Sequence, residues 1–167
     1  KVGFVGSGRM GTGAICQIGL MDGMDVVAIA DLNIDNAIRA FELSGYNKED
    51  IVVTDSLTSA TRAILSGKII VTEDANLIPL LNVDAVVDAT GHPELGARIA
   101  YQTIQEKKHI IMLNVETDVV IGPILNQMAQ NAGVVYTVSS GDEPGLIAEL
   151  YDRYTALGFE VVAVGKT

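Results

Sequence analysis

The sequence predicts an α/β domain built on a doubly wound, mostly parallel sheet. Apolar runs of strand length alternate with helical stretches of ten or more residues, which is the pattern of βαβ units. Aromatic residues make up only 5% of the chain and Trp is absent, so the core must be aliphatic, as in parallel strands buried on both faces. At 167 residues the chain fits one domain with a sizeable core.

The expected elements follow this alternation along the chain. Strands are expected at residues 1–5, 25–30, 68–71, 84–89, 109–113, 134–138 and 159–164, and residues 51–54 are ambiguous. Helices are expected at residues 9–22, 34–43, 56–65, 74–81, 93–107, 119–131 and 144–157. Gly45 and Gly133 follow two of these helices as C-terminal caps would. The stretch 45–72 is expected to be peripheral.

Charge and cysteine content restrict the partners and the compartment. The formal net charge is −10 and the pI about 4.4, and such a surface repels a phosphate backbone, so nucleic acid is not expected as a partner. The single cysteine, Cys16, fits a reducing compartment. No apolar run reaches membrane-spanning length and no signal peptide is recognisable. We expect a soluble, cytoplasmic protein without a membrane partner.

A glycine-rich loop follows the first expected strand. Residues Gly6–Gly11, which read Gly-Ser-Gly-Arg-Met-Gly, fit G-x-G-x-x-G and open the next helix. Asp31 lies 20 residues after Gly11, at the end of the second strand. This context predicts a Rossmann dinucleotide-binding domain for residues 1–167.

Each position of the loop has an expected role in binding the cofactor. Gly6 permits the tight turn, Gly8 lets the backbone approach a pyrophosphate, and Gly11 lets the helix pack on the strand. The helix N-terminus supplies free N–H groups. Within the loop, Arg9 either reaches the cofactor or stays solvated, and Ser7 and Met10 complete the candidate site. Asp31 is expected to accept hydrogen bonds from the adenosine ribose; the alternative is that the glycines only shape a turn and Asp31 caps a helix.

The residues around Asp31 also bear on the choice of cofactor. A carboxylate repels the 2′-phosphate of NADP, and Leu32 stands where a compensating Arg would follow. NAD is therefore preferred. NADP stays possible, because Arg9 and Arg39 are candidate partners for that phosphate.

Three further strand ends are expected at the same edge of the sheet, where doubly wound folds bind ligands. Ala89, Thr90 and Gly91 are expected to line the nicotinamide side. His92 is a candidate acid–base catalyst, although a His in such a turn also serves as a helix cap. Asn114 could hold the carboxamide or the substrate, or be a simple turn residue.

Carboxylates also gather at these strand ends. Glu116 and Asp142 are candidate catalytic or substrate-binding residues, with Asp118 and Glu143 close to them in sequence. Such a group could bind substrate hydroxyls or a divalent metal. The alternative is capping of helix N-termini, which suits Asp142 and Glu143 before the next helix. No metal site is predicted.

Four segments together resemble a known family. They are VGFVGSGRMGTG (residues 2–13), DATGHPELG (88–96), HIIMLNVETDVVIGP (109–123) and SSGDEPG (139–145). They resemble the N-terminal domain of homoserine-dehydrogenase-like oxidoreductases with a C-terminal SAF domain, a group that includes 1-deoxy-D-xylulose 5-phosphate reductoisomerase-like enzymes. The resemblance implies hydride transfer between a nicotinamide and a small oxygenated substrate. It also implies a longer chain with a substrate and oligomerisation domain, and hence a homo-oligomer.

The sequence departs from the family at two points. Homoserine dehydrogenases carry an Asn-Lys pair where this chain has Asn114 followed by Val115, so homoserine as the substrate is in doubt. The reductoisomerase-like relatives are more similar here, but many have an Arg where this chain has Leu32. We expect the isolated piece to turn over little substrate; the alternative function is a non-catalytic NAD(H) sensor that controls an attached module.

Overall fold

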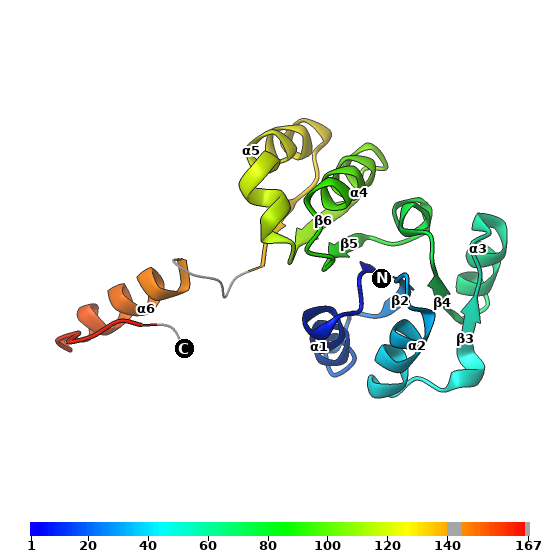
Figure 1. Ribbon diagram of the computed structural model, residues 1–167, viewed down its shortest axis with the longest axis horizontal. Helices are drawn as coiled ribbons and strands as arrows, with labels where there is room; N and C mark the ends of the chain where they lie inside the picture. Colours follow the sequence, from blue (N-terminus) through cyan, green and yellow to red (C-terminus); the bar gives the residue numbers. More distant parts are fainter. Residues whose placement is uncertain (140–144, 166–167) are drawn as a thin grey trace.

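The computed structural model describes residues 1–139 and 145–165, and Figure 1 shows the arrangement of their elements. One all-parallel sheet has the strand order β3-β4-β2-β1-β5-β6-β7. Its strands are β1 (Val2–Val5), β2 (Val26–Ala30), β3 (Ile51–Val53), β4 (Ile69–Thr72), β5 (Ala85–Asp88), β6 (His109–Met112) and β7 (Tyr136–Val138). The helices are α1 (Arg9–Ile18), α2 (Ile34–Leu43), α3 (Leu57–Leu65), α4 (Pro93–Gln105), α5 (Val115–Ala132) and α6 (Gly145–Ala156), with 3₁₀ helices η1 (Lys48–Asp50) and η2 (Ala75–Leu80).

Helices cover both faces of the sheet, which confirms the predicted α/β doubly wound class. Helices α1 and α2 lie on one face, and α4 and α5 lie on the other (Figure 1). The core is correspondingly divided into two apolar clusters. Phe4 and Phe41 belong to the cluster under α1 and α2, and Ile70 and Ile99 belong to the cluster on the opposite face. All four side chains are fully buried, as expected for parallel strands covered on both sides.

The order of the strands places the switch point between β1 and β5. The chain leaves β1 for β2 on one side, and β5 later pairs with β1 on the other. Ligands of doubly wound sheets bind at the carboxyl ends of the strands at such a point. The loop after β1 and the loop after β5 therefore lie together where a ligand is expected.

The stretch 45–72 is peripheral only in part: β3 is the edge strand of the sheet, whereas the expectation was wrong for β4. Strand β4 pairs with β2 on one side and with β3 on the other. Ile70 and Val71 are fully buried. A strand of four residues gives a weak signal in sequence, and its central place comes from pairing with distant strands.

Some helix boundaries also differ from the expected ones. Helix α1 ends at Ile18, earlier than residue 22, and α5 begins at Val115, earlier than residue 119. The early start of α5 has a local cause, since the side chain of Asn114 caps it by accepting from the N–H of Thr117 at 3.1 Å. The expected helix at 74–81 is the 3₁₀ helix η2, which contains Pro79.

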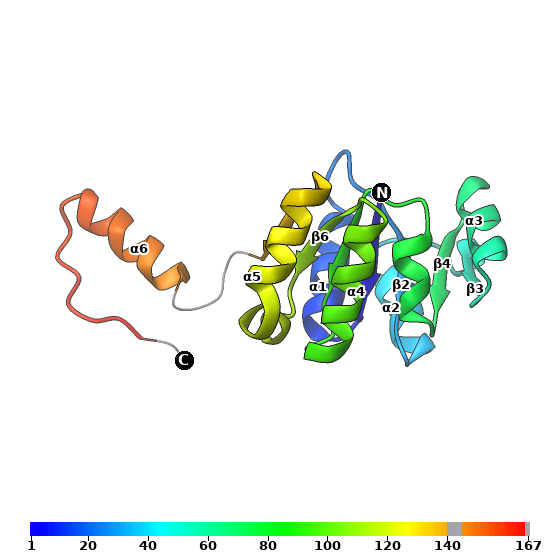
Figure 2. The ribbon, with the colours of Figure 1, turned by 90° about the horizontal axis from the view of Figure 1, so that it is seen from above.

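The last expected strand, residues 159–164, is not formed. Figures 1 and 2 show α6 and the segment after it away from the sheet, and this segment has no regular structure up to residue 165. An extended segment becomes a strand only where an edge is within hydrogen-bonding reach. Phe159 and Val162 are 62% and 88% exposed. Across the described residues, no helix is both long and apolar enough to cross a membrane.

Candidate functional site

The loop from β1 to α1 has the backbone shape that its glycines predict. Gly6 has a φ of +95°, and a Cβ there would lie 2.8 Å from the carbonyl oxygen of Ala89. A Cβ on Gly11 would collide with the carbonyl oxygen of Gly6. Gly8 differs, because a Cβ there would meet nothing within 4 Å. The first and third glycines are thus needed for packing, and the second borders open space that a ligand could fill.

The open space over Gly8 lies at the start of α1. Gly8 is the N-cap residue of this helix and has no side chain to cap the amides of the first turn. The first turn of α1 also carries no acidic residue. Free N–H groups and the positive end of the helix dipole favour an anion at such a place. The loop therefore suits the pyrophosphate of a dinucleotide.

Asp31 anchors this loop to the end of β2. Its Oδ2 accepts from the backbone N–H of Ser7 at 2.7 Å and from the Ser7 hydroxyl at 2.6 Å. Its Oδ1 accepts from the N–H of Asn33 at 2.8 Å. Ser7 is itself buried, and its role as the partner of Asp31 has no signature in the sequence motif. A carboxylate has about four acceptor positions, so Asp31 retains acceptor capacity for a ribose.

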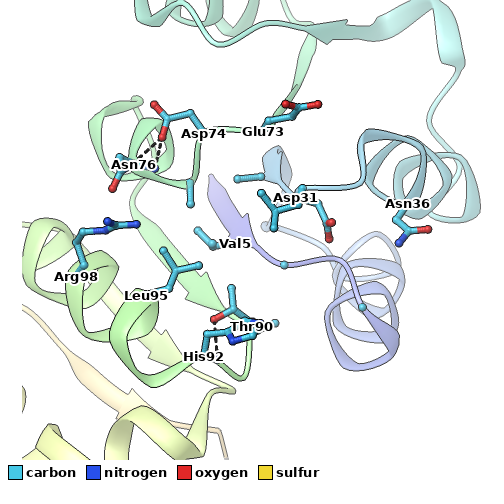
Figure 3. Close-up of a pocket in the computed structure, with 16 residues that line it drawn as sticks. Val5, Asp31, Asn36, Glu73, Asp74, Asn76, Thr90, His92, Leu95 and Arg98 are labelled. Carbon is cyan, nitrogen blue, oxygen red and sulfur yellow. Dashed lines mark hydrogen bonds between the residues drawn. The ribbon is translucent and has the colours of Figure 1, made fainter.

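A cleft of about 430 Å³ opens at the carboxyl end of β1. Figure 3 shows its labelled side chains arranged around Val5. It is lined by Val5, Gly6, Gly8, Ala30, Asp31, Leu32, Asn36, Glu73, Asp74, Ala75, Asn76, Ala89, Thr90, His92, Leu95 and Arg98. The glycine loop, Asp31 and the loop after β5 thus share one cavity, as the sequence predicts.

Part of the cleft wall was not predicted. Residues Glu73–Asn76 follow β4, and Leu95 and Arg98 come from α4. Asp74 accepts from the N–H and the side-chain amide of Asn76, at 2.9 and 2.8 Å. The end of β4 would have been a candidate had the sequence revealed that β4 lies beside β2.

The two candidate partners for a 2′-phosphate lie together beside the glycine loop. A second hollow, of about 390 Å³, is lined by Ser7, Gly8, Arg9, Thr12, Asn36, Arg39, Ala40 and Leu43. Arg9 and Arg39 therefore face a common space, and Asn36 borders both this hollow and the cleft. Met10 is 67% exposed and borders neither.

A buried polar network supports the loops after β5 and β6. Oδ1 of Asp88 accepts from the N–H of Thr90 at 3.0 Å and from its hydroxyl at 2.7 Å. Oδ2 accepts from the side-chain amide of Asn114 at 2.9 Å. Burial raises the pKa of Asp88, and the hydrogen bonds from Thr90 and Asn114 oppose that shift.

Asn114 is fully buried and does not line the cleft. Its amide also donates to the Thr90 hydroxyl at 3.1 Å and to the His92 carbonyl at 3.2 Å, while its Oδ1 caps α5. Its polar atoms are thus occupied inside the protein. In this arrangement Asn114 supports the cleft wall and is not presented to a ligand.

The other predicted residues of this edge have different environments. His92 is exposed, lines the cleft and occupies the N-cap position of α4. Gly91 is exposed, with a φ of +67°. Glu116 is exposed in the first turn of α5 and does not line the cleft. Asp142 lies outside the described residues, as does Glu143.

Asp118 is directed to a different neighbour. It accepts from the Tyr136 hydroxyl at 2.8 Å, and burial together with Asp118 raises the pKa of Tyr136. Within residues 1–139 and 145–165, no three His, Cys, Asp or Glu side chains come together as metal ligands.

These features define a Rossmann-like domain with a cleft at its switch point, and comparison with solved structures agrees on the fold. The chain is similar to the WlbA dehydrogenase from Bordetella pertussis, solved with NADH and UDP-GlcNAcA (TM-score 0.62, 19% identity, 95% of this chain and 43% of that one). It is similar to a homoserine dehydrogenase from Thiobacillus denitrificans (TM-score 0.61, 21% identity, 93% and 33%). It is also similar to biliverdin reductase from Synechocystis, solved with biliverdin and NADP+ (TM-score 0.62, 18% identity, 94% and 42%).

This chain spans less than half the length of each of the three structures. No protein-family model matches the chain, and no curated protein matches it in sequence. At these identities the likeness establishes the fold, a Rossmann-like fold that this chain shares with the three proteins.

Proposed function

We propose that this chain is the cofactor-binding domain of an NAD(P)-dependent oxidoreductase. The observation that carries the proposal is the open space over Gly8, which lies beside Asp31 at the mouth of the switch-point cleft. The free amides of α1 would hold the pyrophosphate, and Asp31 would accept from the adenosine ribose. The nicotinamide half would then extend over residues 89–92, on the other side of β1.

The structural neighbours support an oxidoreductase of this general kind. Two of them are described with NADH or NADP+, and all three are named as dehydrogenases or reductases. We propose a homoserine-dehydrogenase-like or reductoisomerase-like enzyme, acting on a small oxygenated substrate, from the four sequence segments that resemble that family. A C-terminal substrate domain and a homo-oligomer belong to the same proposal.

NAD is the preferred cofactor in this proposal. Asp31 would repel a 2′-phosphate at the end of β2, where no basic residue follows it. Arg9 and Arg39 lie close by, around a common hollow. NADP therefore remains the alternative, with its extra phosphate placed toward these two residues.

The bound nicotinamide would accept or donate a hydride at its ring. The residues of this chain would orient the ring and handle the accompanying proton. His92 lines the cleft and is exposed, and in this proposal its imidazole would exchange a proton with substrate or water. Glu116 and Asp142 are further candidates for contact with the substrate.

Calorimetry with NAD+ and NADP+ tests the proposal on the chain itself. NAD+ should bind, and Gly8→Ala should weaken binding at least about tenfold, because the new methyl group occupies the space of the pyrophosphate. The Gly8 backbone has a φ of −64° and a Cβ there meets no atom, so this variant should fold. Gly13→Ala is the matched control, since its Cβ also meets no atom and it lies in α1, the helix that Gly8 precedes as N-cap. The proposal is contradicted if neither NAD+ nor NADP+ binds the wild-type chain. It is also contradicted if Gly8→Ala binds the cofactor as tightly as the wild type.

A non-catalytic NAD(H) sensor is the second candidate. The observation in its favour is that the polar side-chain groups of Thr90 and Asn114 are already occupied by Asp88 and its neighbours. The full-length protein decides between the two. Oxidation of NADH in the presence of aldehydes, ketones or sugar phosphates supports the enzyme, whereas tight binding without turnover of any of them supports the sensor.

A further inference from the structure

An acidic side chain is buried at the carboxyl end of β5. Asp88 is fully buried, and among the buried residues that the structure describes it is the one with an ionisable side chain. Burial of a carboxylate without hydrogen bonds is costly, so such a group needs donors around it. Asp88 has three donor groups, from Thr90 and Asn114.

The partners of Asp88 come from two different loops. Thr90 belongs to the loop after β5, and Asn114 belongs to the loop between β6 and α5. Both loops are therefore held by one carboxylate. Asn114 reinforces the connection, because it donates to the Thr90 hydroxyl and to the His92 carbonyl.

Helix α4 closes the network from a third side. A Cβ on Gly96 would collide with Oδ2 of Asp88 and with the Thr117 hydroxyl. The Thr117 hydroxyl in turn donates to the carbonyl of Pro93 at 3.2 Å, at the start of α4. The space around the carboxylate is thus closely filled, and a longer acid would not fit without moving α4.

Only some members of this hydrogen-bond network line the cleft. Thr90 and His92 line the cleft, whereas Asp88 and Asn114 lie behind them. The Thr90 hydroxyl donates to Asp88 and accepts from Asn114, and it also accepts from the N–H of His92 at 3.4 Å. Its hydrogen-bonding capacity is therefore used to hold the loop in place. Gly8 and Asp31, which also line the cleft, have no hydrogen bond to this network in the described residues.

We propose that Asp88 is a positioning residue that fixes residues 89–92 against the nicotinamide half of the dinucleotide, without acting on the adenosine half. The inference rests on the proposed function, which places the nicotinamide over that loop. It goes further, because it assigns a role to a residue that cannot touch the cofactor. Loss of the carboxylate would loosen the wall under the nicotinamide and leave the pyrophosphate and ribose contacts unchanged.

The test compares two ligands on the same variant. Calorimetry measures the affinity for NADH, which carries the nicotinamide, and for ADP-ribose, which lacks it. Asp88→Asn keeps the shape of the side chain but replaces an acceptor by a donor facing Asn114 or Thr90. We expect NADH to bind about tenfold more weakly, a change of about 1.4 kcal/mol, while the affinity for ADP-ribose stays within about twofold of the wild type.

Two further variants keep the experiment decisive. Thr90→Val removes the hydroxyl and leaves Asp88 in place, so it should reproduce the selective loss even if Asp88→Asn does not fold. Asp55→Asn is the matched control, because Asp55 also accepts from a threonine hydroxyl, that of Thr72 at 2.6 Å, near the end of β4. It should leave the ratio of the NADH and ADP-ribose affinities unchanged.

The outcomes separate this inference from the proposed function. Equal weakening of NADH and ADP-ribose in Asp88→Asn and Thr90→Val would show a general structural role and overturn the inference. Unchanged binding of both ligands would overturn it as well. If neither ligand binds the wild-type protein, the proposed function fails, and the inference fails with it.

Discussion

Replacement of Gly11 by alanine tests how much the close packing of Gly11 against the Gly6 carbonyl contributes to the stability of the fold. Gly11 is buried in the first turn of α1. A Cβ added there would collide with the carbonyl oxygen of Gly6 and lie 3.1 Å from its carbonyl carbon. It would also lie 3.4 Å from the Cβ of Ala89. The neighbours that must move are backbone atoms of a tight turn, and they cannot rotate away as a flexible side chain would.

Two opposing effects determine how much Gly11→Ala changes the free energy of unfolding. Forcing an extra methyl group into a filled site costs about 1 to 3 kcal/mol, while alanine is favoured over glycine in a helix by about 1 kcal/mol. Gly11→Ala should therefore be destabilised by up to about 2 kcal/mol. Gly13→Ala, two residues later in the same helix, meets no atom within 4 Å and should be stabilised by about 0.5 to 1 kcal/mol.

Urea unfolding measures both variants against the wild type. The midpoint should fall for Gly11→Ala and rise for Gly13→Ala, with unchanged slopes, because neither substitution alters the surface exposed on unfolding. If Gly11→Ala were as stable as Gly13→Ala, the close packing of α1 on the loop would not be a constraint. Close packing would then be refuted as the reason for a glycine at position 11.

Two further predictions concern cofactor choice and pH. Asp31→Ala should reduce the ratio of the affinities for NAD+ and NADP+, measured by calorimetry, because the repulsion of a 2′-phosphate is removed; an increased ratio would contradict the preference for NAD. The ammonium of Lys68, 2.7 Å from Asp50, holds the pKa of that carboxyl below its ordinary value. The ion pair therefore stabilises the fold above the usual carboxyl range and loses its effect as the pH falls through the lowered pKa. Wild type and Asp50→Asn should differ slightly in melting temperature near neutral pH, and their melting temperatures should converge in acid. A difference in melting temperature that is independent of pH would show that the Lys68–Asp50 ion pair does not cause it.

The sequence was most informative where backbone geometry demands a particular residue. Gly6 and Gly11 could be predicted because only glycine fits their turn and their close approach, and Asp31 because the strand places it at a fixed distance. The end of β5 could also be recognised, because a short apolar strand ends there just before a helix. In the structure Gly6 and Asp31 line one cleft, whereas Gly11 is buried against the backbone of Gly6.

The sequence was least informative where partners are distant along the chain. Asp88 looked like an ordinary strand residue, because its partner Asn114 belongs to another loop. The bond between Ser7 and Asp31 was missed for the same reason. The apolar run at 159–164 has the composition of a strand, but composition cannot tell whether an edge lies within reach.

The pairing of β1 with β5 determines when the cleft forms during folding. Val2 aligns with Ala85, so this contact closes a long loop that contains β2, β3 and β4. Contacts between such distant residues form slowly, because loop-closure entropy must be overcome first. The cleft takes Asp31 from within this loop and His92 from the segment after β5. Its appearance during refolding should therefore coincide with the joining of the two halves of the sheet, and a bound dinucleotide would hold that junction closed.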